Sequence, residues 1–312
     1  LLIILTAESK NMKGQDDRKA QLKVSGLGRK PNLKVPPFSC ETHSHIYGPV
    51  KQYPLWPGRL GEPICSIDAY NEMLKRLGFD RAVIVQPSAY GSDNRCTLDA
   101  ISARGLKNTR GVCVTKRDVS SRSLQRLHDQ GIRGLRFFLM ADDFGLADAL
   151  FMAKKIAPLG WHIQFQDDGV WLEEAVNVFE TLPVDCVIDH IGRIGCGESA
   201  DTKGFKALLK FFESGRCWIK LSAPYYMCTN GHNGKKGNQP DYGEVSGYVR
   251  ALAEVRPDRL VWAANWPHPQ FPISDKPDEA NCLDVMVDWI PDEAIRRMIF
   301  VDNPARLYDF QS

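Results

Sequence analysis

Eight short apolar runs, each followed by a polar loop and most by a helical pattern, constrain the fold of this chain more than any other feature. Each run is only three to six residues long, and its apolar residues are nearly continuous, which is typical of parallel strands covered on both faces. We therefore predict eight strands, at Phe38–Thr42, Arg81–Gln86, Arg110–Val114, Gly134–Phe138, His162–Gln166, Cys186–Ile188, Cys217–Leu221 and Leu260–Ala263.

Helix start and stop signals lie between several of these runs. Ser66 precedes a helical pattern that ends at Gly78, and two further patterns end at Gly131 and Gly160. A Ser or Asp before such a pattern and a Gly after it are the expected capping residues. Eight strand–helix units without a sequence repeat predict an α/β fold, a (β/α)₈ TIM barrel over residues 35–312, with a doubly wound sheet as the alternative.

Composition supports one globular domain and excludes some partner classes. The 312 residues are 43% hydrophobic and 25% charged, which suits a single barrel. Residues 1–34 hold eight Lys or Arg and only three Asp or Glu, so we expect a flexible basic leader outside the fold. The apolar stretch 1–5 is too short to span a membrane, and the barrel region has no basic stripe with interleaved aromatics. We therefore expect neither a membrane nor a nucleic acid as partner.

Nine cysteines, an odd number, occur without a C-x-x-C pair or close clustering. Several lie inside predicted strands, where buried reduced thiols are the ordinary state. The cysteine pattern therefore predicts a cytoplasmic protein without a disulfide framework.

Polar side chains recur where the predicted strands end, and in a barrel those C-terminal ends carry the chemistry. Each residue alone has a structural explanation, but their convergence favours an active site. The set comprises His43, His45, Gln86, Ser88, Arg136, Gln164, Gln166, Asp189, His190, Arg193, Lys220, Ser222, Tyr225, Asn265 and His268.

Several motifs resemble one known family. They are "THSHIYGP", "VQPSAYGSDN", "GIRGLRFF", "VIDHIGR", "WIKLSAPY", "LVWAANWPHP" and "VDNPARLYDF", in this order from about residue 36 to residue 310. Together they resemble the amidohydrolase superfamily, in particular the branch of the 2-pyrone-4,6-dicarboxylate lactonase and its lactone-acting relatives. The resemblance implies a (β/α)₈ barrel, a small-molecule lactone or cyclic ester as substrate, and hydrolysis without a metal cofactor.

The resemblance also implies roles for individual residues. His43, His45 and His190 match the histidines that bind or polarise the carbonyl oxygen, and Asn265 stands where the family has its general-base Asp. Ser88 and Arg136 match substrate-binding positions. Further candidates for substrate contact are Gln166, Lys220, Tyr225 and Tyr53, although Lys220 could equally neutralise a nearby acid.

Departures from the superfamily pattern bear on metal binding. Many members hold zinc with the H-x-H pair, a strand-five His and the strand-eight Asp, whereas this chain offers Gln164, Gln166 and Asn265 at the latter positions. Because zinc needs three or four N, O or S ligands, we expect no cofactor. Zinc held by the two H-x-H imidazoles and His190 is the alternative.

Asn265 raises a second question, because a neutral amide cannot take a proton from water. Three explanations stay open. The residue is an engineered replacement of Asp, or one of the histidines is the base, or the reaction uses a substrate hydroxyl instead of water, as in lactone isomerases of this family. The chain is thus expected to be a lactonase-type hydrolase, with a lactone isomerase as the alternative.

Charge recognition differs as well. Asp142, Asp143 and Tyr226 stand where the dicarboxylate lactonase resemblance implies further cations, so we expect a substrate with at most one carboxylate. The rival readings are a metal-dependent hydrolase and a catalytically inactive barrel that serves as a binding protein. The sequence leaves the oligomeric state open, a homodimer included.

Overall fold

The structure, a computed structural model, describes residues 28–62, 65–138, 145–166, 169, 172–194, 202–228, 242–269, 271–272 and 276–311. Asp142 and Asp143, on which part of the charge argument depends, lie outside the described residues, as do residues 1–27 of the expected leader.

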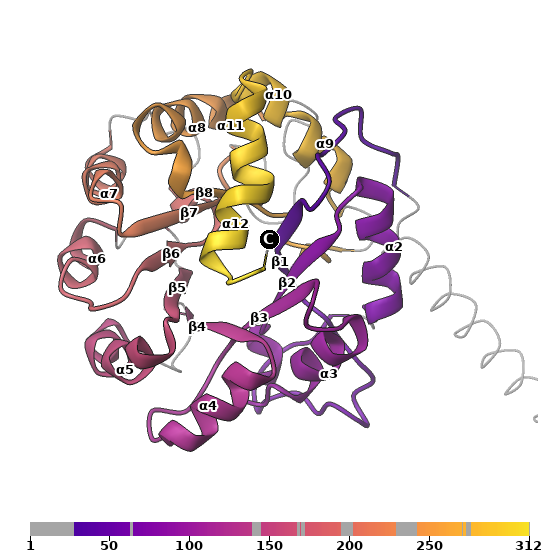
Figure 1. Cartoon of the computed structure of the whole chain (residues 1–312), viewed down its shortest axis with the longest axis vertical. Coiled ribbons are helices and arrows are strands. Elements are labelled where there is room, and N and C mark those ends of the chain that lie inside the picture. Colours follow the sequence, from indigo (N-terminus) through magenta and orange to yellow (C-terminus); the bar gives the residue numbers. More distant parts are fainter. Residues whose placement is uncertain are drawn as a thin grey trace, which may run out of the picture.

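Eight parallel strands lie in the order β1 to β8, each paired with the next along the chain. This order confirms the predicted barrel and excludes the doubly wound sheet, whose strand order reverses at its middle. Figure 1 shows the strands as a ring with helices around it. The strands are β1 (Cys40–Ser44), β2 (Arg81–Val85), β3 (Thr109–Cys113), β4 (Ile132–Phe138), β5 (His162–Gln166), β6 (Cys186–Ile188), β7 (Cys217–Leu221) and β8 (Leu260–Trp262).

The segment after β8 closes the ring against β1. Ser44 and Trp266 form an isolated parallel bridge, and the His45 N–H donates to the Trp266 carbonyl at 2.8 Å. The Asn265 N–H donates to the His43 carbonyl, also at 2.8 Å. Barrel closure therefore places residue 265 directly beside the H-x-H pair, although 222 positions separate Asn265 from His43 in the sequence.

The helices surround the strands. Ser66 accepts a hydrogen bond from the Ala69 N–H at 3.2 Å, and Gly78 ends the same helix with φ +90°, so both predicted caps of α2 are confirmed. The helices are α2 (Ile67–Leu77), α3 (Arg95–Arg104), α4 (Ser121–Asp129), α5 (Ala149–Ile156), α6 (Leu172–Phe179), α7 (Lys203–Glu213), α8 (Gly243–Val255), α9 (Glu279–Asp284), α10 (Met286–Trp289), α11 (Glu293–Arg297) and α12 (Asn303–Leu307).

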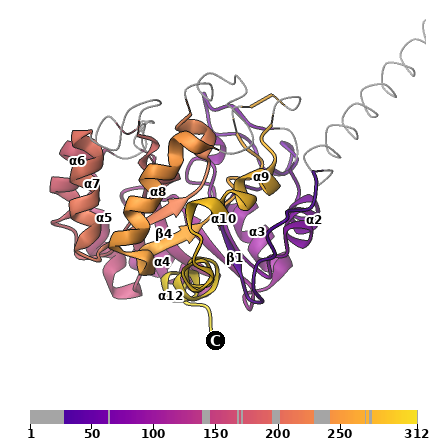
Figure 2. The ribbon, with the colours of Figure 1, turned by 90° about the horizontal axis from the view of Figure 1, so that it is seen from above.

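The C-terminal segment closes the end of the barrel where the strands begin. Figure 2 shows α12 beneath the strands, and the Tyr308 and Phe310 rings pack with Val83 and Val112 inside the barrel. Arg110 on β3 donates to the Asp309 carbonyl at 2.7 Å. Because this end is filled, a substrate can enter only from the opposite end, where the strands finish.

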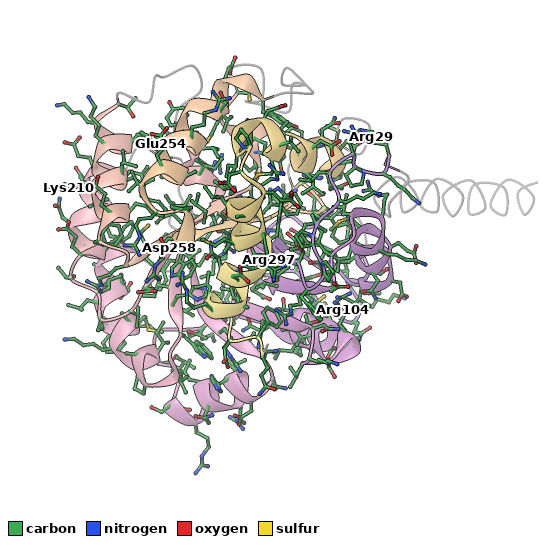
Figure 3. The ribbon with its side chains drawn as sticks, turned by 45° about the horizontal axis from the view of Figure 1, so that its top comes forward. Arg29, Arg104, Lys210, Glu254, Asp258 and Arg297 are labelled. Carbon is green, nitrogen blue, oxygen red and sulfur yellow. The ribbon has the colours of Figure 1, made fainter. Side chains whose placement is uncertain are left out.

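Residues 28–34 contact the barrel surface. Arg29 donates to the Asn281 side chain and pairs with Asp284 at 2.6 Å, and the Leu33 N–H donates to Asp284 at 2.9 Å (Figure 3). The predicted domain boundary at residue 34 stays a prediction. No helix among the described residues is both long enough and apolar enough to cross a bilayer.

Candidate active site

Three histidines predicted from the sequence lie together at the end of the barrel where the strands finish. The ring centroid of His43 is 4.9 Å from that of His45 and 4.9 Å from that of His190. Residue 43 lies in β1 and residue 45 directly follows it, so their side chains lie on the same side because side chains alternate along an extended chain. Each of the three rings is at most 3% exposed. The cluster is therefore shielded from bulk water.

Hydrogen positions in this cluster follow from its partners. His45 Nδ1 lies 2.8 Å from the Val85 carbonyl oxygen, which can only accept, so this nitrogen carries the hydrogen. A neutral His45 then offers a lone pair at Nε2, which faces His43 Nε2 at 3.2 Å. His43 Nδ1 has two competing partners, the Asp189 carboxylate at 3.1 Å, which can only accept, and Lys220 Nζ at 3.3 Å, which donates.

Burial keeps these imidazoles uncharged at neutral pH. Desolvation lowers the pKa of His45 to about 3. It also lowers the pKa of His43 and of His190 well below the usual 6.5, assisted at His43 by the Lys220 charge and at His190 by His43. Imidazoles of this kind are weak bases, but their N–H groups remain good hydrogen-bond donors to a developing oxyanion.

Asp189 is the charged centre beneath the histidines. Its carboxylate lies 3.1 Å from His43 Nδ1, accepts from Gln164 Nε2 at 3.0 Å, and lies 3.6 Å from both Arg136 and Lys220. A second proton on His43 would turn the first of these contacts into an ion pair. Asp189 is therefore in a position to stabilise positive charge on His43.

Lys220 lies fully buried within this network. Its ammonium group donates to the Thr42 carbonyl at 3.0 Å and to Gln164 Oε1 at 2.7 Å. Desolvation lowers its pKa to about 8, although the Asp189 charge opposes that shift. These contacts favour the role of neutralising an acid over the role of touching substrate.

Arg136 reaches into the same network from β4. It donates to the Gln86 carbonyl at 2.9 Å and to the Gln166 side chain, and its guanidinium is 3% exposed. Its Nε hydrogen has no partner among the described residues. Since a buried N–H without a partner is costly, this atom is available for a substrate oxygen.

Asn265, which follows β8, contacts two tyrosines that follow β7. Its Nδ2 group donates to the Tyr225 hydroxyl at 2.9 Å. Burial raises the pKa of Tyr226, and the Arg193 charge and a hydrogen bond with Asn265 oppose the shift. The Tyr226 ring lies 5.4 Å from the His190 ring and 4.3 Å from the Arg193 guanidinium. Tyr226 thus links Asn265 to the histidine cluster.

Two predicted substrate contacts lie farther out. Ser88 is half-buried in the short turn that follows β2. Tyr53 donates to the Asp99 side chain at 2.7 Å, and its ring is 6.4 Å from that of Tyr90. The structure does not bring Tyr53 into contact with the histidines, and its role stays a prediction.

Left-handed backbone conformations mark the ends of β6, β7 and β8. The φ angles are +54° at His190, +47° at Ala223, +60° at Asn265 and +57° at His268. Such conformations cost about 1–3 kcal/mol each in residues other than Gly and gather at functional sites. The Ser222 hydroxyl, 2.8 Å from His190 Nδ1, fixes the ring in this strained turn. The Nε2 atom of His190 is then the nitrogen that a substrate can approach.

The sequence alone assigns no specific role to Asp189, Tyr226 or His268. Asp189 and His268 were visible as polar residues at strand ends, but the sequence holds no signal that Asp189 contacts four partners. The contact of Tyr226 with His190 depends on the left-handed turns and could not be read from spacing.

A divalent ion is the cofactor to consider, because ligand atoms of His43, Asp189 and His190 lie within 4.8 Å of one another. However, the Asp189 carboxylate already faces the cations of Arg136 and Lys220 at 3.6 Å. Two nearby positive charges repel a dication, and the ends of β5 and β8 supply amides, which are weaker zinc ligands than His or Asp. The donor set therefore fits a zinc ion poorly.

Comparisons with known proteins identify relatives of this chain. The profile of the amidohydrolase family matches residues 40–310. A 2-pyrone-4,6-dicarboxylate hydrolase from Comamonas testosteroni is 36% identical over 284 residues, covering 89% of this chain and 92% of that protein. A D-galactarolactone isomerase from Agrobacterium fabrum is 28% identical over 291 residues, covering 92% and 95%. The solved apo structure of an Agrobacterium tumefaciens protein superposes with a TM-score of 0.82 at 27% identity, covering 91% and 98%.

Proposed function

The chain belongs to the amidohydrolase family and is an enzyme that acts on lactones, and we propose that it hydrolyses a lactone or related cyclic ester without a resident metal ion. The observation that carries this proposal is the buried cluster of neutral imidazoles at the barrel end, with His43 4.9 Å from both His45 and His190. Such a cluster can hold a carbonyl oxygen by hydrogen bonds and stabilise the charge that develops on it.

In the proposed reaction, water attacks the lactone carbonyl carbon and the carbonyl oxygen becomes an oxyanion. We assign the Ser222 hydroxyl, 2.8 Å from His190 Nδ1, as the donor to that nitrogen, so the Nε2 hydrogen of His190 points to the oxygen. The His43 ring centroid lies 4.9 Å from those of His190 and His45. Collapse of the intermediate breaks the ring C–O bond, and the proton that water loses ends on the alkoxide that leaves. Asn265 orients the attacking group.

The charged groups of the site suit a substrate that carries a single negative charge. Arg136 offers its Nε hydrogen, because its terminal nitrogens already contact the Gln86 carbonyl, the Gln166 side chain and Asp189. One N–H fits a single carboxylate oxygen, whereas a dicarboxylate calls for several guanidinium forks. Tyr226 presents an aromatic ring beside His190 at the position where the resemblance implies a cation, although the Arg193 guanidinium lies 4.3 Å from that ring. We therefore propose a lactone with at most one carboxylate.

The proposal includes a cytoplasmic location. Eight of the nine cysteines lie among the described residues, and all eight are buried, which agrees with thiols in a reducing compartment.

The direct test is turnover of a panel of lactones that carry no, one or two carboxylates, followed by NMR of the products. Ring-opened hydroxy acids, formed fastest from the lactones with one carboxylate, are the expected result. If no lactone or ester in the panel turns over, the proposal fails. A preference for dicarboxylates would leave hydrolysis intact but refute the charge argument.

Lactone isomerisation is the second candidate, favoured by the amide at position 265. A substrate hydroxyl would then replace water as the nucleophile, and Asn265 would orient it. The same NMR assay distinguishes the two, because isomerisation yields a second lactone and no free carboxylate.

A further inference from the structure

A chain of buried hydrogen bonds leads from Asn265 away from the histidine cluster. Asn265 Nδ2 lies 2.9 Å from the Tyr225 hydroxyl, which lies 2.9 Å from His268 Nδ1. His268 Nε2 lies 3.1 Å from Glu279 Oε1, and the other Glu279 oxygen pairs with Arg76 at 2.5 Å. The residues of this hydrogen-bond chain other than Arg76 are each less than 9% exposed.

The direction of each hydrogen bond in this chain can be worked out from its charged end. Burial opposes ionisation of Glu279, but the hydrogen bond from His268 and the Arg76 charge lower the pKa of its carboxyl. The ionised carboxylate can only accept, so His268 Nε2 carries a hydrogen. With that single ring hydrogen on Nε2, His268 would accept at Nδ1, and the Tyr225 hydroxyl hydrogen would point to it. The Tyr225 oxygen is left to accept from position 265.

Position 265 must therefore donate to Tyr225, which an amide can do and an ionised carboxylate cannot. We infer that Tyr225, His268 and Glu279 are positioning residues that hold the Asn265 amide with its nitrogen toward Tyr225, so that its oxygen faces the substrate as a hydrogen-bond acceptor. This inference rests on the proposed function, because Asn265 is the group that orients the nucleophile there. The directions of the neighbouring hydrogen bonds alone would fix the orientation of the Asn265 amide.

The chain also explains why an amide is compatible with this site. With Asp at position 265, the Tyr225 hydroxyl would turn its hydrogen to the new carboxylate. His268 would then have to donate from Nδ1 while still donating from Nε2 to Glu279, so it would carry a second proton. Around His268 lie Glu279, Tyr225 and Lys276, whose ammonium donates to the His268 carbonyl at 3.1 Å and pairs with Glu62 at 3.0 Å. The residue at 265 thus sets the protonation of an imidazole that it does not touch.

The first test needs no substrate. Nitrogen-15 NMR of histidine-labelled full-length protein, with His268 assigned by its loss in His268→Gln, reports which ring nitrogen carries hydrogen. We expect the neutral form with hydrogen on Nε2 in the wild type, and hydrogen on both nitrogens in Asn265→Asp at the same neutral pH. Hydrogen on Nδ1 in the wild type, or an unchanged ring in Asn265→Asp, would overturn the inference whatever the enzyme's substrate.

The second test is kinetic and uses a lactone that the wild type opens. Tyr225→Phe removes the acceptor for Asn265, so kcat should fall about 10- to 100-fold with KM changed less than about threefold. The glutamine of His268→Gln still offers an acceptor to Tyr225 and a donor to Glu279, so this variant should retain most activity. His268→Leu removes both hydrogen bonds, so its loss of kcat should equal that of Tyr225→Phe. Equal loss in the Gln and Leu variants would show a merely structural role. If the wild type opens no lactone, the proposed function fails. The NMR result still decides whether the hydrogen bonds from Asn265 to Glu279 have the inferred directions.

Discussion

Lys220 links the site's charges to the stability of the barrel, and replacing it gives a quantitative test of that network. The ammonium group is buried against Asp189, Gln164 and the Thr42 carbonyl, and desolvation lowers its pKa from 10.5 to about 8. This lowering of the pKa means that the charged form of Lys220 is about 3 kcal/mol less favourable in the folded protein than in the unfolded chain. We predict that Lys220→Met removes a pH dependence of stability that the wild type has.

The sign follows from proton binding. Because the folded-state pKa lies below the unfolded one, the unfolded chain holds more protons between about pH 8 and 10.5, so this group's contribution to folding becomes more favourable as pH rises. From about pH 7.5 to about pH 9.5 the wild type should gain about 2 kcal/mol relative to Lys220→Met. Cysteines titrate in the same range, but they are common to both proteins and cancel in the difference.

The measurement is the free energy of unfolding by urea at half-unit pH steps for both proteins. Lys210→Met is the matched control, because Lys210 lies exposed on the outer side of α7 (Figure 3), and its curve should follow that of the wild type. Parallel curves for the wild type and Lys220→Met across this window would refute the buried-ammonium reasoning.

Three further predictions concern the site. Ser222→Ala removes the partner of His190 Nδ1, so kcat should fall about 10-fold with little change in KM, and an unchanged kcat would refute the assigned role of His190. Arg136→Lys keeps the charge but loses the Nε donor, so KM for a monocarboxylate lactone should rise about 10-fold while KM for a neutral lactone stays the same. Purified enzyme should contain less than about 0.1 equivalent of transition metal and keep its activity in chelator, and activity that follows metal content would contradict the charge argument at Asp189.

Much of the architecture could be predicted because periodicity and capping are local. The ranges of β5, β6 and β7 and the caps of α2 agree with the sequence prediction. The first strand does not, since it runs Cys40–Ser44 instead of Phe38–Thr42. Phe38 has φ +66° and is 61% exposed, whereas the polar residues up to Ser44 are fully buried inside the barrel end. Apolar patterning therefore misplaced a strand whose buried residues are polar.

The residues of the candidate site could be predicted from the sequence, but the contacts between them could not. The H-x-H pair and His190 could be placed at strand ends by alternation and topology alone. The four contacts of Asp189 and the chain from Asn265 to Glu279 depend on side chains that barrel closure brings together from distant positions. The left-handed conformations at His190 and Asn265 also left no local sequence signal, because neither residue is a glycine.

Reaction in ¹⁸O-labelled water tests most directly whether the imidazole cluster opens a lactone ring by adding water. With a lactone that the enzyme turns over, the account predicts one labelled oxygen in the carboxylate of the ring-opened product after a single turnover. Turnover that leaves the product without label would contradict it.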